Sequence, residues 1–146
     1  MILITGCAGY IGSELCKKLE KSNINYVGIR DVASVNTFND ILVMFWKYRG
    51  NWSSFWRPGT TDPGTYYLND TMGNPLGTAV LKEDQYRGAW KLGKHQGKYT
   101  ALVQRKEVTV VRDANQDGVL DIDGGYEDTG FFGINHHRAN AKNESV

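Results

Sequence analysis

The chain has 146 residues, enough for about one domain with a single core. Its composition, 40% hydrophobic and 23% charged residues, is typical of globular proteins, and a net charge of only +1 argues against a nucleic-acid partner. No run approaches the ~18 apolar residues of a membrane span, and the first residues lack the basic start of a secretory signal. We therefore expect no membrane partner and a cytoplasmic or virion-associated location.

Residues 1–31 have the order strand, glycine turn, helix, strand. The apolar run "ILI" leads into "TGCAGYIG", and Ile11, Leu15 and Leu19 then recur with helical spacing. This spacing predicts a helix over 10–21, and "NYVGIRD" predicts a second strand that ends at Asp31. The segment therefore has the order of a short β-α-β unit.

The glycines of this segment have the spacing that holds a dinucleotide. Gly6 permits a tight turn, Gly9 lets a pyrophosphate approach the backbone, and Gly12 lets the helix pack on the sheet. Asp31 lies where an acidic group binds a ribose hydroxyl. The stretch resembles the start of the extended short-chain dehydrogenases, the nucleotide-sugar epimerases and dehydratases. That resemblance implies that these three glycines and Asp31 surround NAD.

The remainder of the chain lacks other features of that family. No further β-α units are legible, and none of the eight tyrosines has a lysine four residues later, as the Tyr-x-x-x-Lys pair requires. We therefore expect no cofactor, with NAD as an alternative, and we interpret residues 1–31 as a fused fragment or a strand-helix cap.

Residues 32–146 alternate short β-rich runs with glycine-rich turns. The runs are "DILVMFW", "TYYL", "TAVL", "YRGAWKLG", "YTALVQ", "EVTVVR" and "GFFGIN". Strands that recur every ~10 residues predict an antiparallel sandwich or barrel. The expected fold is therefore mainly β, with residues 1–31 as a preceding β-α-β segment.

Several distinctive stretches occur in order within about residues 25–140. They are "FND", "TTDPGTYYL", "GTAVLKEDQYRGAWKLGKHQGKY", "ALVQ", "VTVVRDANQDGVLD" and "TGFFGINHHRAN". With these stretches the chain resembles a group of mostly phage and bacterial proteins related to the L,D-transpeptidase catalytic domain. The resemblance implies a cell-wall fold and the stem peptide of peptidoglycan as a partner.

The resemblance also implies a site. In that family a thiolate attacks a peptidoglycan amide, a histidine takes up its proton, and backbone N–H groups hold the oxyanion. "FFGINHHRAN" matches the histidine stretch, so His137 is the candidate base, with Arg138 beside it, and His136 is expected on the opposite face. No Ser-x-Gly-Cys motif follows, so we expect an incomplete, inactive form. The alternative is a structural histidine on a strand.

The acidic loop "DANQDGVLDID" is a candidate calcium site. Asp113, Asn115 and Asp117 have the spacing of ligand positions 1, 3 and 5, followed by glycine at position 6, and Asp121 and Asp123 supply further carboxylates. Gly124 stands where a bidentate acid is expected at position 12. A turn stabilised by local Asp and Asn hydrogen bonds is the alternative.

A third functional hypothesis needs no catalysis. The chain could be a structural or interaction protein, such as a virion component, that uses an aromatic surface. The tryptophans that would contribute to it are Trp46, Trp52, Trp56 and Trp90.

Overall fold

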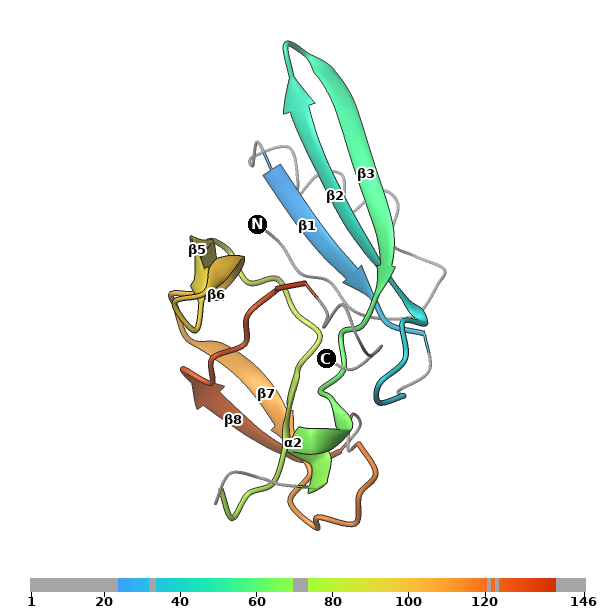
Figure 1. Cartoon of the computed structure of the whole chain (residues 1–146), viewed down its shortest axis with the longest axis vertical. Coiled ribbons are helices and arrows are strands. Elements are labelled where there is room, and N and C mark those ends of the chain that lie inside the picture. Colours follow the sequence, from blue (N-terminus) through green and yellow to red (C-terminus); the bar gives the residue numbers. More distant parts are fainter. Residues whose placement is uncertain (1–23, 32–33, 70–73, 121, 123, 139–146) are drawn as a thin grey trace.

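The computed structural model describes residues 24–31, 34–69, 74–120, 122 and 124–138. These residues form three antiparallel sheets, with strand orders β1-β2-β3, β4-β7-β8 and β5-β6 (Figure 1). The elements are β1 (Ile24–Ile29), β2 (Asp40–Tyr48), β3 (Asn51–Gly59), α2 (Thr65–Asn69), β4 (Ala79–Leu81), β5 (Trp90–His95), β6 (Tyr99–Gln104), β7 (Val108–Arg112) and β8 (Tyr126–Gly130). The mainly β, antiparallel character expected from the sequence is confirmed.

The helix predicted over 10–21 lies outside the described residues. Within the described ranges, no helix is long and apolar enough to cross a membrane.

The first sheet joins the end of the N-terminal segment to the β-rich part. The expected strand before Asp31 is present as β1, and it pairs antiparallel with β2 from Ile24↔Trp46 to Ile29↔Ile41. The boundary at residue 31 stays a prediction. β2 then returns as β3 through Arg49 and Gly50, which both have positive φ, as a tight two-residue hairpin turn requires.

Two of the expected strands are wrong. "TYYL" lies in the short helix α2, because the Gly64 carbonyl accepts the Leu68 N–H and the Asn36 side chain accepts the N–H of Thr65. "GFFGIN" is largely irregular, and the strand at this point is the preceding segment, β8. From Phe131 onward, hydrogen bonds to the side chain of Gln104 replace most of the backbone pairing of a strand.

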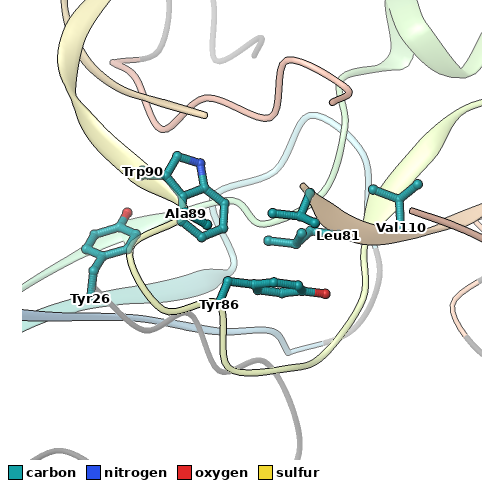
Figure 2. Close-up of a cluster of buried hydrophobic side chains, with 7 residues drawn as sticks. Tyr26, Leu81, Tyr86, Ala89, Trp90 and Val110 are labelled. Atoms are coloured by element: carbon teal, nitrogen blue, oxygen red, sulfur yellow. The ribbon is translucent and has the colours of Figure 1, made fainter. Parts of the chain in front are cut away.

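The core lies where the three sheets meet. Its buried side chains come from β1, β4, the segment before β5, the first residue of β5, and β7 (Figure 2), and they are Tyr26, Leu81, Tyr86, Ala89, Trp90, Val108 and Val110. The Tyr86 ring meets the Trp90 ring edge to face, with 5.9 Å between centroids. The Tyr86 hydroxyl donates to the Thr109 carbonyl. Burial raises the pKa of Tyr86 to about 12.

Candidate functional site

An open groove of about 1110 Å³ runs between the first sheet and the segment 131–138. One side is formed by Tyr26, Leu42 and the loop 58–64, and the other by Leu102 and the segment 131–138. Clefts of this size accommodate small molecules and short peptides. The groove brings the TTDPG loop of the sequence together with the predicted His137 and Arg138.

The segment 130–138 is positioned by the side chain of Gln104 at the end of β6. Its Oε1 accepts the N–H groups of Phe132 and Ile134, both at 3.1 Å, and its Nε2 donates to the Gly130 carbonyl. Trp90 Nε1 donates to the Ile134 carbonyl at 2.7 Å. Side-chain groups thus satisfy the backbone where "GFFGIN" was expected to pair as a strand.

The two adjacent histidines point to opposite sides, as the sequence predicted. His136 pairs with Leu102 through two backbone hydrogen bonds, and its ring lies between the rings of Tyr26 and Trp90, with centroids 5.0 and 4.9 Å away. Burial, and to a smaller extent the neighbouring His137, lowers the pKa of His136 to about 4. His136 is therefore neutral near pH 7, with a half-buried ring beside the core residues Tyr26 and Trp90.

His137 lies in the wall of the groove, as His136 does, but its ring has different neighbours. Its ring stacks on His95 with 4.1 Å between centroids, and Tyr99 Oη lies 3.3 Å from its Nδ1. That Nδ1 is also 2.8 Å from the carbonyl oxygen of Arg138. Because a carbonyl only accepts, Nδ1 carries the proton in the neutral ring, and the lone pair lies on Nε2. This is the tautomer that a base acting through Nε2 requires.

Two neighbours of His137 were not identified from the sequence. His95 and Tyr99 are on the strands of the β5–β6 hairpin, at opposed positions around the turn. Burial, His137 and Lys98 lower the pKa of His95. The signal available in the sequence was the "KHQGKY" turn, which brings these two side chains together.

Arg138 is the exposed cation of the site. Its guanidinium lies over the Tyr99 ring, 4.9 Å from the centroid. The ion pairs found among the described residues do not involve Arg138. The guanidinium therefore offers its donors to an external carboxylate.

The opposite wall of the groove is fixed by buried charges. Asp40 accepts the Thr61 N–H at 2.6 Å and the Thr61 hydroxyl at 2.7 Å. Arg30 Nε lies 2.9 Å from Asp62 Oδ1, and both side chains are buried. Burial raises the pKa of Asp62, although the Ser34 N–H and Arg30 oppose that shift. The TTDPG loop is thus held in one position relative to β2.

The acidic loop uses its side chains locally. Asp113 Oδ1 accepts the Gln116 N–H, Asn115 Oδ1 accepts the Asp117 N–H, and Asp117 Oδ1 accepts the Val119 N–H. These contacts are those of the turn alternative. The other two candidate ligands, Asp121 and Asp123, lie outside the described residues, and calcium binding stays a prediction.

The residues predicted to surround NAD are only partly described. Gly6, Gly9 and Gly12 lie outside the described residues. Asp31 is the second residue after β1, is exposed, and donates its N–H to Asp40 Oδ1 at 2.9 Å.

Comparison with known proteins matches one family to the N-terminal part of the chain. The model of the NAD dependent epimerase/dehydratase family matches residues 2–62. The match includes the three glycines and Asp31, and it supports the resemblance of this segment to that family. No curated protein and no solved structure is significantly similar to the chain. Nothing in these comparisons supports the resemblance to L,D-transpeptidases.

The described part of the matched segment forms antiparallel strands. Residues 24–31 and 34–62 include β1, β2 and β3, which pair antiparallel. The strands of a nucleotide-binding β-α-β unit are parallel and need a crossover connection. The arrangement after residue 24 therefore differs from that of a dinucleotide-binding unit.

Proposed function

We propose that the chain is a cell-wall-related module that binds the stem peptide of peptidoglycan in the groove and does not cleave it. The observation that carries the proposal is the pair His137 and Arg138 in the wall of an open groove, beside the fixed TTDPG loop.

The chemistry of the groove suits a short acidic peptide. Apolar side chains such as Leu42 and Leu102 line it, and Arg138 supplies a cation for a carboxylate of the stem peptide. The peptide is held between the TTDPG loop and the segment 131–138. Part-buried hydrogen bonds hold both walls in place, so we expect binding to order little of the chain.

Binding without cleavage follows from the groups beside His137. Its contacts are His95, Tyr99 and the Arg138 carbonyl, and both cysteines of the chain, Cys7 and Cys16, lie outside the described residues. In the described part, no thiol is available for the covalent step that a histidine base would assist.

The test is calorimetric titration of the full chain with a synthetic stem peptide. Arg138→Ala should weaken binding about 10- to 100-fold, the range of a hydrogen-bonded charge pair. Lys91→Ala, an exposed cation on β5 outside the groove lining, is the matched control and should bind as the parent does. Absence of binding at millimolar peptide, or equal binding by Arg138→Ala, would contradict the proposal.

A second candidate is NAD binding by the N-terminal segment, favoured by the family match over residues 2–62. Here Gly6, Gly9 and Gly12 would hold the pyrophosphate and Asp31 the ribose. The test is fluorescence titration with NADH. Binding at or below ~10 μM, about −7 kcal/mol, that is lost in Gly9→Trp would establish this function. Absence of binding would exclude it.

A further inference from the structure

The β2–β3 hairpin carries an aromatic and basic surface that the groove does not use. Its exposed rings are Tyr48 (61% exposed), Trp52 (48%), Phe55 (49%) and Trp56 (61%). None of these rings lines the groove. Among the described residues, β1 pairs with β2 only as far as Trp46, and the hairpin beyond that point has two strands. Its turn lies at one end of the long axis of the molecule (Figure 1).

The rings lie on both faces of this hairpin. Directly opposed residues of antiparallel strands share a face, and neighbours along a strand alternate. The pairs Lys47↔Trp52 and Val43↔Trp56 place two tryptophans on one face. The pairs Tyr48↔Asn51 and Met44↔Phe55 place the other two rings on the opposite face.

The charge of the hairpin has one sign. Between Asp40 and Asp62 there are three cations, Lys47, Arg49 and Arg57, and no acidic residue. Each cation lies over an aromatic ring of the hairpin, at 5.7, 5.2 and 4.4 Å from the centroids of Trp52, Tyr48 and Phe55 respectively. In the described part of the chain, none of the three takes part in an ion pair.

We propose that this hairpin tip binds the surface of an anionic phospholipid bilayer. Rings with an apolar body and a polar edge are favoured at the depth of the headgroups, and the cations beside them meet lipid phosphates. Tyr48 and Trp52 lie on opposite faces of the outer end of the hairpin, so both rings are buried when this end enters the headgroups. Phe55 and Trp56 lie further from the turn, where they meet the surface only if the hairpin lies against it. The hairpin therefore carries aromatic rings for the headgroup region and, directly beside them, positive charges for the lipid phosphates.

Two other partners fit the same surface less well. A single-stranded nucleic acid stacks its bases along one face, and here that face would cover only half of the rings. A second copy of the chain paired through the edge strand β3 would bring like charges together, because each hairpin contributes three cations and no acid.

The test is flotation of the full chain with vesicles of phosphatidylcholine alone and of phosphatidylcholine mixed with phosphatidylglycerol. We expect binding to the mixed vesicles, with tryptophan emission shifted to shorter wavelength. Each cation near an anionic surface is worth about fivefold in partitioning, so removal of all three should weaken binding on the order of 100-fold. The charge variant combines Lys47→Gln, Arg49→Gln and Arg57→Gln.

A matched control removes three exposed cations from the β5–β6 hairpin and should bind within about twofold of the parent, as charges away from the bilayer are screened. It combines Lys91→Gln, Lys94→Gln and Lys98→Gln. A second variant, Trp52→Ser with Trp56→Ser, should lose both binding and the emission shift. All of these side chains are exposed, and circular dichroism verifies the fold of each variant.

Several results would overturn the proposal. They are equal binding to both kinds of vesicle, equal binding by the charge variant and the parent, and displacement of the protein from vesicles by an equal mass of oligo-dT. Concentration-dependent dimers that only the hairpin variants abolish, without vesicle binding, would assign the surface to a second copy instead.

Discussion

Acid should destabilise the protein through His136, whose ring is enclosed by Tyr26 and Trp90. In the folded state its pKa is about 4, below the ordinary value of 6.5. The unfolded chain therefore binds a proton below about pH 6.5 that the folded chain does not bind, and acid favours unfolding. Above about pH 6.5, neutral His136 makes its full contribution to the free energy of unfolding. That contribution is lost as the pH falls from there through the folded pKa of about 4.

The size of the effect follows from the two pKa values. Between about pH 7.5 and pH 5, linkage gives a loss of roughly 2 kcal/mol, which approaches about 3 kcal/mol below pH 4. His136→Phe keeps an aromatic ring at this position and removes the titrating group. It also removes a buried Nε2 that has no hydrogen-bond partner among the described residues. The variant should lose this part of the acid dependence.

The assay is urea unfolding of the parent and His136→Phe at the two pH values. The parent should lose about 2 kcal/mol more than the variant on acidification. Asp62 and His95 also titrate, but they are present in both proteins, and their contributions cancel in the difference. His137→Gln is the comparison variant: because burial is the larger cause of the low pKa of His136 and His137 the smaller one, this variant should keep most, but not all, of the acid dependence of the parent. Equal losses in the parent and His136→Phe would refute the assignment of a low pKa to the buried ring.

Three further predictions concern the loops. Asp40→Ala removes a buried acceptor of three hydrogen bonds and should lower the free energy of unfolding by about 2–4 kcal/mol in urea titrations; a loss below about 0.5 kcal/mol would contradict its structural role. Gly77→Ala places a Cβ against the Asp113 carbonyl oxygen at positive φ and should lower the free energy of unfolding by at least about 2 kcal/mol. Gly97→Ala, also at positive φ but in open space, should lower it by about 1 kcal/mol. Similar losses for the two variants in thermal unfolding would refute the close approach at Gly77. For a site with a millimolar Kd, Ca²⁺ at about ten times that concentration should raise stability by roughly 1.4 kcal/mol at most, and an unchanged Tm between chelator and Ca²⁺ would leave only the turn interpretation of the acidic loop.

The sequence predicts strands well where local pattern and pairing agree. "DILVMFW" and "EVTVVR" are β-branched or aromatic runs, and they correspond to β2 and β7. β3 was missed because its two serines and Pro58 are poor strand formers. Its pairing is set by the Arg49–Gly50 turn, and Pro58 is tolerated because β3 is an edge strand.

The candidate site shows where local pattern is insufficient. The opposite orientation of His136 and His137 follows from the alternation of an extended chain and could be predicted. The replacement of a strand ladder by Gln104 could not, because it depends on one amide side chain 26 residues before Gly130 in the sequence. The stacking of His95 on His137 is likewise a tertiary contact, between segments far apart in the chain.

The most direct test of stem-peptide binding is an NMR titration of the full chain with the synthetic peptide, following backbone amides and histidine ring signals. The account predicts that shifts are confined to the segment 131–138, the ring of His137, His95, Tyr99 and the TTDPG loop. It also predicts that Arg138→Ala reduces those shifts at equal peptide concentration. Spectra that do not change at millimolar peptide, or shifts confined to the β2–β3 hairpin, would contradict the assignment of the groove as the binding site.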